Sequence, residues 1–403
     1  MSEWSVCQID DLGEINRGKS KHRPRNDSIL FGGKYPFIQT ADVKKANLYI
    51  TEYEATYSDI GLAQSKLWKK GTLCITIAAN IAESAILGID ACFPDSVVGF
   101  IPFEKKSDIR FVKYLLDEFK VYMQQISKGT TQDNLSLEKL RRVKFRAPNY
   151  DIQVKIANTI AAYDDLIENN NKRIKILEQI AENLYKEWFV RFRFPGHETI
   201  PIENGIPKGW RIDKIENISN VTDGVHNTIQ DTPNSPYLLL SCKNIKDGKI
   251  QIGENERTID EKTFFTLRKR TQLSKGDILI TSVGTIGDVH LLNQEPSYIE
   301  FQRSVAIIKP NKELVNSCYL YETFKSMRKE FENAAHGAAQ QCLFIGDINR
   351  MKVCLPPFKI CQLFEKKVQQ IYDLILTLSN QCDNLIKQRD LLLPRLMSGK
   401  LAV

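Results

Sequence analysis

Residues 156–188 read IANTIAAYDDLIENNNKRIKILEQIAENLYKEW, with apolar residues at alternating steps of four and three. Residues 364–396 read FEKKVQQIYDLILTLSNQCDNLIKQRDLLLPRL and repeat these steps 208 positions later. Such a heptad pattern predicts a long helix with one apolar seam, so we expect two such helices. The predicted seam residues are Ile156, Ile160, Tyr163, Ile167, Asn170, Ile174, Leu177, Leu184 and Trp188, then Phe364, Val368, Ile371, Ile375, Leu378, Cys382, Leu385 and Leu392.

The repetition also covers the sequence before each helix. Lys-Gly-Thr-Thr-Gln at 128–132 lies 208 residues before His-Gly-Ala-Ala-Gln at 336–340. Lys-Gly-Thr at 70–72 and Lys-Gly-Asp at 275–277 each precede a short β-rich apolar run, which is typical of a strand that leaves a turn. Each half is therefore expected to be a mixed unit of helices and strands, followed by one long helix.

This order predicts an α+β fold of two mixed α/β domains related by a pseudo-two-fold axis and separated by two long coiled-coil helices. If these helices pair antiparallel about that axis, Asn170 is expected opposite Cys382, and the second helix should end near Pro394. The expected segments are a first globular domain at 1–150, a first helical region at 151–192, a connector at 193–209, a second globular domain at 210–357 and a second helical region at 358–403.

Composition limits the class of protein. The chain has 403 residues, 42% of them hydrophobic, which is enough for real cores. Its nine cysteines show no Cys-x-x-Cys spacing, so we expect free thiols in a reducing cytoplasm, with neither a disulfide framework nor a metal site. The start, Met-Ser-Glu-Trp, does not read as a signal peptide, and no apolar run approaches the ~20 residues of a membrane helix.

A search for catalytic motifs finds none. The chain contains no Gly-x-Gly-x-x-Gly, no His-Glu-x-x-His and no Gly-x-Ser-x-Gly. Ala-Pro-Asn-Tyr at 147–150 and Leu-Pro-Pro-Phe at 355–358 lack the leading Asn of the adenine methyltransferase motif that they partly match. The sequence therefore predicts no catalytic residue, and prolines that close a strand before a helix explain both segments.

A dense basic loop in the first half points to nucleic acid. Five positive charges fall within nine residues, and Gly18 and Pro24 indicate a loop from which they can contact a phosphate backbone. The alternative is a solvated surface loop, because the net charge of +7 is only moderate. The corresponding segment 222–227 of the second half is not basic. The expected phosphate contacts are Arg17, Lys19, Lys21, Arg23 and Arg25.

Other polar residues on loops are candidates for reading base edges. Gln bonds adenine and Arg bonds guanine in a bidentate manner in the major groove. Glutamine ends both recurring glycine loops, and Gln302-Arg303 lies in a polar step before a strand. The alternative for each is a turn kept for its glycine. The remaining expected DNA contacts are Thr130, Thr131, Gln132, His226, Thr285, Gln302, Arg303, His336, Gln340 and Gln341.

The whole architecture resembles the specificity subunit of type I restriction–modification systems. The resemblance rests on Lys-Gly-Asp-Ile-Leu-Ile-Thr at 275–281, Gly-Thr-Ile-Gly at 284–287, the Gly129 and Gly337 loops, and the first helix with its end at 183–190. It covers essentially the full chain, and the doubled order of its motifs is specific. In the first half, Ala-Ala-Asn-Ile at 78–81 replaces the Gly-Thr-Ile-Gly pattern.

The resemblance implies a DNA-binding subunit without catalytic activity, in which each domain reads one half of a bipartite target on double-stranded DNA. It further implies that the two helices pack as an antiparallel coiled coil, which acts as a spacer between the half-sites. Two methyltransferase subunits and the restriction (motor-nuclease) subunits would assemble with the chain. S-adenosylmethionine and ATP are then expected on those partners, and no cofactor on this chain. Two rival functions are a fused enzyme, for which no third region remains, and a coiled-coil adaptor that binds only protein.

Overall fold

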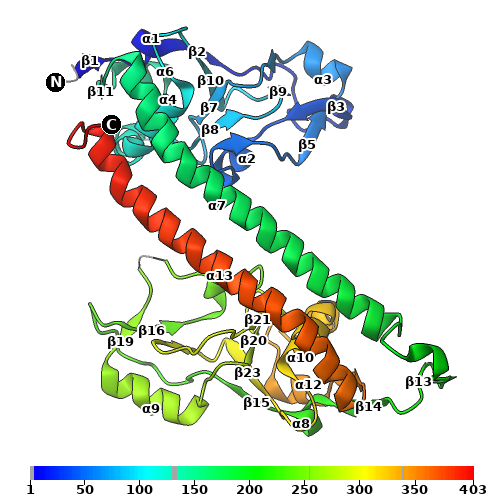
Figure 1. Cartoon of the computed structure of the whole chain (residues 1–403). Helices are drawn as coiled ribbons and strands as arrows, with labels where there is room; N and C mark the ends of the chain where they lie inside the picture. The colour runs from blue at the N-terminus through cyan, green and yellow to red at the C-terminus, as the bar shows by residue number, and fades with distance from the viewer. Residues whose placement is uncertain (1–3, 129–133, 254, 338–339) are drawn as a thin grey trace. The chain divides into compact units, whose positions relative to one another are not determined.

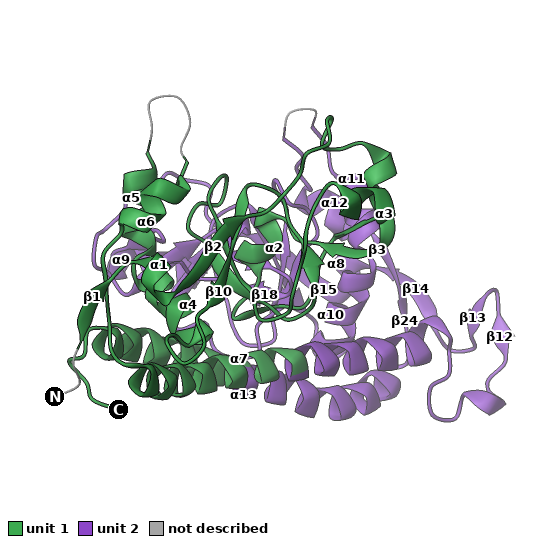
Figure 2. Cartoon of the chain, turned by 90° about the horizontal axis from the view of Figure 1, so that it is seen from above, with its two compact units in different colours: residues 1–172, 379–403 green, residues 173–378 purple. Residues whose placement is uncertain are grey.

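A computed structural model of the chain describes residues 4–128, 134–253, 255–337 and 340–403. The chain divides into two compact units. Unit 1 comprises residues 1–172 and 379–403, and unit 2 comprises residues 173–378 (Figure 2). Both units mix helices and strands, as expected. Among the described residues, no helix is both long enough and apolar enough to cross a membrane.

Unit 1 is built on two main sheets. The larger has the strand order β2-β10-β7-β8-β4, and the smaller β5-β3-β9-β6. The strands are β1 (Ser5–Cys7), β2 (Gly13–Arg17), β3 (Phe31–Phe37), β4 (Tyr49–Ile50), β5 (Ala55–Tyr57), β6 (Leu67–Trp68), β7 (Leu73–Thr76), β8 (Ser84–Leu87), β9 (Ala91–Cys92), β10 (Val97–Pro102) and β11 (Phe145–Ala147). The short helices are α1 (Ile9–Leu12), α2 (Thr40–Lys45), α3 (Asp59–Ala63), α4 (Ile109–Glu118), α5 (Lys120–Ser127) and α6 (Leu137–Arg142).

Unit 2 has a four-stranded sheet, β15-β23-β20-β21, and a three-stranded sheet, β19-β16-β22. Its strands are β12 (Ile202–Glu203), β13 (Ile206–Pro207), β14 (Arg211–Lys214), β15 (Ser219–Asp223), β16 (Tyr237–Leu240), β17 (Ile245–Lys246), β18 (Lys249–Ile250), β19 (Thr258–Ile259), β20 (Ile278–Thr281), β21 (Val289–Leu291), β22 (Ile299–Phe301), β23 (Val305–Pro310) and β24 (Lys352–Leu355). Its short helices are α8 (Ile215–Ile218), α9 (Glu261–Thr271), α10 (Ser317–Ser326), α11 (Arg328–Ala334) and α12 (Ile345–Arg350).

The repeat seen in the sequence is also a repeat of structure. The bounds of α4, β10 and α6 recur in α10, β23 and α12 after a shift of 208 residues. β10 and β23 also have equivalent partners: β2 pairs antiparallel with β10, and β15 pairs antiparallel with β23. β10 and β23 then pair antiparallel with β7 and β20. Each half of the chain therefore forms the same sheet from the same segments.

The two long helices are α7 (Tyr150–Tyr185) and α13 (Phe358–Met397), and α7 ends in a π-helical turn, Lys186–Val190 (Figure 1). Within unit 1, Arg389 Nη1 donates to Asp164 Oδ1 at 2.7 Å, and Asn170 Nδ2 donates to Gln381 Oε1 at 3.4 Å. Residue numbers therefore rise along one helix as they fall along the other, which confirms the antiparallel pairing. The partner of Asn170 is thus Gln381, the residue directly before the expected partner, Cys382.

Within unit 2, the end of α7 packs against the start of α13 through aromatic rings. The ring centroids of Trp188 and Phe364 are 5.9 Å apart, and those of Phe189 and Phe364 are 5.0 Å apart. All the predicted seam residues are buried or half-buried. In unit 1, however, Ile156 and Ile160 belong to the core of the globular part, so this part of the seam also binds the helix to its own domain.

The second helix ends at Met397, which is near the expected end, but α13 continues through Pro394 instead of stopping at it. A proline inside a helix costs roughly 3 kcal/mol through its missing hydrogen bond and ring clash. Beyond it, Leu396 is 1% exposed and Met397 is 6% exposed, both in the core of unit 1. Burying each side chain contributes roughly 1.5–3 kcal/mol, which offsets the cost of the proline.

Candidate nucleic-acid interface

The sheet of unit 2 brings three loops to one edge. β15 ends where β23 begins, with Asp223 opposite Ala306, and β20 ends there too, with Thr281 opposite Val305. Because both neighbours run antiparallel to β23, the segments after β15 and β20 meet the segment that enters β23. These segments contain most of the expected DNA contacts of the second half.

The loop after β15 and the segment before β23 form the walls of a hollow. Arg303 N donates to Val225 O at 3.0 Å, which holds the two segments together. The hollow has a volume of about 350 Å³. Its lining includes three predicted contacts, His226, Gln302 and Arg303. His226 and Arg303 are exposed and Gln302 is half-buried, so the structure brings three of the predicted DNA contacts to one concave surface.

The loop after β20 joins the other predicted contacts of unit 2. Gly284 N donates to Gln341 O at 3.3 Å, which places the segment with the exposed Thr285 beside Gln341. Gln340 is likewise exposed. His336 is exposed, and its Nε2 lies 3.3 Å from Asp347 Oδ2. Ser282 links the two groups of contacts, because its hydroxyl donates to Arg303 O at 3.4 Å and its carbonyl accepts from Leu343 N at 2.8 Å.

Unit 1 presents the equivalent edge. β2 ends at Arg17 opposite Val98, and β7 ends at Thr76 opposite Val97, so the basic loop leaves the sheet beside the segment that enters β10. Gly18 allows this close approach, because a Cβ there would lie 2.2 Å from Pro94 O. A Cβ at the matching Gly224 of unit 2 would lie 2.0 Å from Phe301 O.

The five basic residues of this loop do not share one environment. Arg17, Lys19 and Lys21 are exposed, and their side-chain nitrogens have no partner among the residues that the structure describes. Arg23 Nη1 donates to two carbonyls of its own loop, at 2.7 and 2.8 Å. Arg25 Nη2 forms an ion pair with Asp95 at 2.7 Å. The structure therefore separates three cations that are free to bind phosphate from two that shape the loop.

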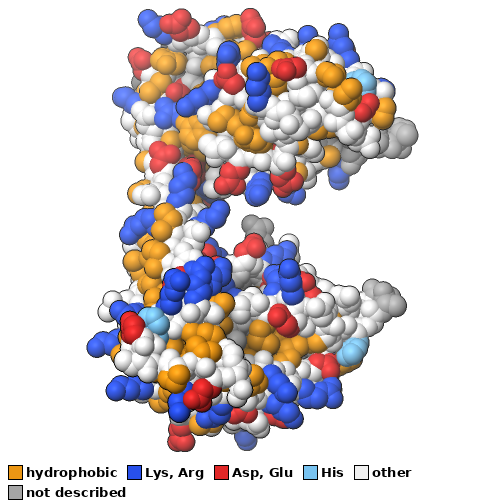
Figure 3. Space-filling view, turned by 90° about the vertical axis from the view of Figure 1, so that its right-hand side faces the viewer, with side chains coloured by type: hydrophobic (Ala, Val, Ile, Leu, Met, Phe, Trp, Pro, Cys, Tyr) orange, Lys and Arg blue, Asp and Glu red, His pale blue; other side chains and the backbone are white. Residues whose placement is uncertain are grey.

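Three predicted contacts, Thr130, Thr131 and Gln132, lie outside the described residues. On the face drawn in Figure 3, basic and acidic side chains are interspersed over the surface of both units. This distribution agrees with the moderate net charge of +7. The face drawn there therefore shows no single large basic field among the described residues.

Sequence reasoning missed the residues that hold these loops in place. Arg257, in the lining of the hollow, donates to Asp231 Oδ1 at 2.7 Å and to Ile229 O at 2.6 Å. In unit 1, Gln64 Oε1 accepts from Lys21 N at 2.6 Å and from His22 N at 3.1 Å. Each partner is distant in sequence and carries no motif, so no pattern in the chain could have indicated it.

Comparison with known proteins gives a consistent result. The family model described as "Type I restriction modification DNA specificity domain" matches residues 1–179 and 227–394. The type I restriction enzyme MjaIX specificity subunit of Methanocaldococcus jannaschii is 26% identical over 417 residues, covering 100% of this chain and 94% of that protein. The HindI specificity subunit of Haemophilus influenzae is 23% identical over 482 residues, covering 100% of both chains.

A solved structure shares the fold. The crystal structure of the S subunit of a type I restriction–modification system from M. genitalium superposes with a TM-score of 0.62. The match covers 98% of this chain and 96% of that chain, at 15% sequence identity. At this level of identity the likeness extends to the fold alone.

Proposed function

The chain belongs to the family of type I restriction–modification DNA specificity subunits, and on that basis we propose that it reads a bipartite target on double-stranded DNA, one half-site with each unit. One observation carries the proposal. Both units present the same set of loops at the same edge of equivalent sheets, but with different side chains. Two half-sites of different sequence can be read in this way, because equivalent sheets position the loops and the different side chains on them contact different bases.

We further propose that the chain is non-catalytic and acts with partners. Methyltransferase subunits and restriction subunits would assemble with it, with S-adenosylmethionine and ATP bound on those partners. Family membership supports this division of labour, as do the incomplete matches to the methyltransferase motif at 147–150 and 355–358. The segment GEINRGKS at 13–20 has the spacing of a phosphate-binding loop, but its residues 13–17 form strand β2 instead of a glycine loop that opens a helix. The paired long helices would serve as the spacer between the half-sites.

Base reading is assigned first to Arg303, whose exposed guanidinium lines the hollow of unit 2. If it forks to a guanine, Arg303→Ala should weaken binding of the assembled complex to its cognate duplex by roughly 1–3 kcal/mol and leave binding to random duplex unchanged. Arg211→Ala, at the exposed β14, is the matched control and should change neither. Competition binding with cognate and random duplexes measures both quantities.

The alternative function, an adaptor that binds only protein, predicts a different result in the same assay. The complex with the methyltransferase subunits would then show no sequence preference for duplex DNA. Equal weakening of cognate and random binding in Arg303→Ala would instead assign this residue to the phosphate backbone.

A further inference from the structure

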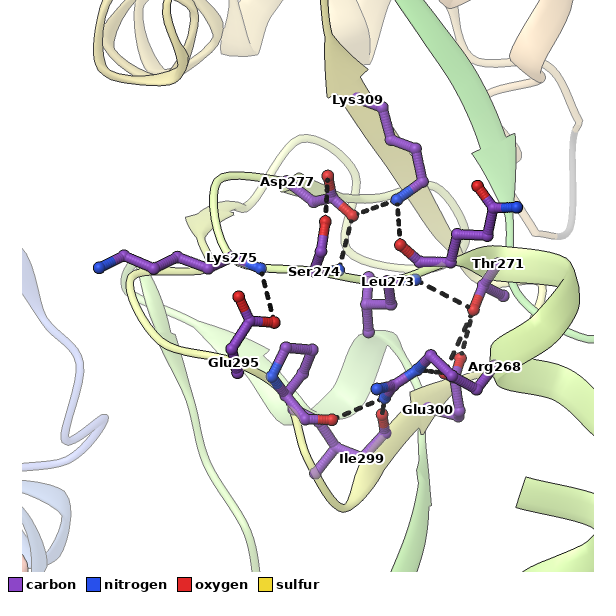
Figure 4. Close-up of polar contacts among 12 residues, drawn as sticks. Arg268, Thr271, Leu273, Ser274, Lys275, Asp277, Glu295, Ile299, Glu300 and Lys309 are labelled. Carbon is purple, nitrogen blue, oxygen red and sulfur yellow. Dashed lines mark hydrogen bonds and ion pairs between the residues drawn. The ribbon is translucent and has the colours of Figure 1, made fainter. Parts of the chain in front are cut away.

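The polar side chains behind the hollow of unit 2 form a buried network (Figure 4). Glu300, in β22, is fully buried, and Arg268 of α9 forms an ion pair with it. Arg268 Nη2 also donates to Pro296 O at 2.6 Å and to Ile299 O at 2.8 Å. Thr271 Oγ1 lies 3.0 and 3.2 Å from the two carboxylate oxygens. The guanidinium and carboxylate thus fix the strand to the helix in one geometry.

The network lies directly beside the residues that line the hollow. Glu300 is two positions before Gln302, whose N donates to Leu240 O at 2.8 Å. Two residues beyond Arg268 on the same helix, Arg270 Nη2 donates to Asp223 O at 2.8 Å, at the end of β15. Helix α9 therefore holds both walls of the hollow, one through Arg268 and the other through Arg270.

The fold itself does not require this ion pair. The shift of 208 residues that relates β23 to β10 places Cys92 of β9 at the position of Glu300. Cys92 is fully buried as well, so unit 1 builds the matching strand with a small apolar group. A buried ion pair is often no more stabilising than apolar residues of similar volume, and its best-attested use is to fix one geometry.

The equivalent segment of unit 1 also supports the recognition loop, with other chemistry. Ser65 precedes the Lys-Gly turn of unit 1 as Arg270 precedes that of unit 2, after a shift of 205 residues. Its hydroxyl donates to Lys19 O at 2.9 Å, in the loop after β2. In both units, the segment before the Lys-Gly turn therefore holds the loop that follows β2 or β15. Unit 1 does so with the hydroxyl of Ser65, and unit 2 with the guanidinium of Arg270.

We propose that Arg268 and Glu300 are positioning residues, which set the place of the Gln302–Arg303 segment and thereby the base selectivity of the second half-site. This inference rests on the proposed function of unit 2. It predicts an effect confined to one half of the target. The geometry of the hollow would relax if the network were removed, while the sheet of unit 2 would persist as its counterpart does in unit 1.

The test uses the full chain assembled with its methyltransferase partners. Arg268→Met with Glu300→Leu replaces the ion pair by apolar groups and leaves no buried charge alone. The control, Lys325→Met with Glu322→Leu, removes another ion pair of unit 2 that has a buried carboxylate, within α10. Among the described residues, Glu322 also bonds Tyr372 of α13, and the pair has no bond to α9 or β22. The rates of methylation of duplexes with single substitutions in either half-site give the discrimination of each unit.

The first double variant should lose about tenfold or more of its discrimination in the second half-site, the factor expected from part of a bidentate base contact. Its discrimination in the first half-site should be unchanged, as should both half-sites in the control. Unchanged discrimination in the second half-site, or equal losses in both variants, would overturn the proposal. Failure of the proposed function would be recognised separately, because the unmodified complex would then discriminate in neither half-site.

Discussion

At the scale of single residues, the basic loop of unit 1 combines two tasks. Lys19 and Lys21 are exposed and have no side-chain partner in the described part of the chain. Arg25 is held by Asp95, which occupies the position that Arg303 has in unit 2 after a shift of 208 residues. Unit 1 thus carries an anionic group where unit 2 carries a cationic one, and its positive charge comes from the loop instead.

This division predicts a difference in salt dependence. Lys19→Gln with Lys21→Gln should weaken binding to cognate and random DNA alike, because phosphate contacts carry no sequence information. The slope of the logarithm of affinity against the logarithm of salt concentration should fall by about 0.9 for each phosphate that the protein no longer neutralises. Arg25→Gln should keep the slope. Titrations at several salt concentrations measure it, and an unchanged slope in the double variant would contradict the assignment.

Two alanines of unit 1 adopt a backbone conformation that normally favours glycine. Ala79 and Ala82 have φ angles of 56° and 63°, and Gly284 and Gly287 have φ angles of 76° and 82°. The structure therefore matches Gly-Thr-Ile-Gly to residues 79–82, one position later than the expected 78–81. The departure of this loop from the Gly-Thr-Ile-Gly pattern therefore changes the residues and keeps the turn. A left-handed conformation costs a residue with a Cβ roughly 1–2 kcal/mol.

Replacing the exposed Ala79 with glycine removes this cost but adds conformational entropy to the unfolded chain, which lowers the gain. The net effect should be an increase of about 0.5–1 kcal/mol in the free energy of unfolding. Ala78→Gly is the control, since Ala78 has no positive φ and its replacement should lower the stability or leave it unchanged. Chemical denaturation compares the free energies of unfolding. A decrease in stability in Ala79→Gly as large as in the control would mean that the loop is not strained.

At the scale of elements, each unit joins a short helix to a long one through a buried tyrosine and a carboxylate. In unit 1, Tyr114 of α4 donates to Asp164 of α7 at 2.6 Å. In unit 2, Tyr372 of α13 donates to Glu322 of α10 at 2.6 Å. The shift of 208 residues maps Tyr114 to Glu322 and Asp164 to Tyr372, so the two copies keep the bond and exchange donor and acceptor. Burial, together with the negative charge of Asp164, raises the pKa of Tyr114, which keeps the donated proton in place.

Removing the donor should loosen the packing between these helices. Tyr114→Phe leaves a buried carboxylate oxygen without one of its bonds and should destabilise the protein by about 1–3 kcal/mol. Tyr122→Phe, at an exposed tyrosine of α5, should stay within about 0.5 kcal/mol. Thermal and chemical unfolding provide the comparison. Equal effects at both tyrosines would show that the bond contributes nothing.

The sequence predicts elements better than it predicts the contacts between them. Heptad steps disclosed both long helices, because apolar periodicity is a local property of the chain, and the family resemblance supplied their antiparallel pairing. Periodicity could not disclose Tyr114–Asp164, whose partners are 50 residues apart, nor that Ile156 packs into the globular core. It also could not show that α13 continues through Pro394, since the burial of Leu396 depends on the tertiary fold.

At the scale of the whole molecule, the repeat allowed the fold class and the doubled arrangement to be predicted. The sequence named His226, Gln302 and Arg303 one by one as DNA contacts, and only the structure shows that they line one hollow. The residues that position them were not found. Arg268 and Glu300 look like surface and strand residues in sequence, and their role follows only from burial.

The reading of one half of the target by each unit is tested most directly by an exchange of domains. Residues 1–150 are replaced with the equivalent domain of another specificity subunit, in cells that express the complete system. Sequencing of the methylated bases in the genome then gives the motif. We expect one half of the motif to change, while the other half and the spacing between them stay as they were. A change of both halves, or of the spacing, would show that the units do not read the target independently.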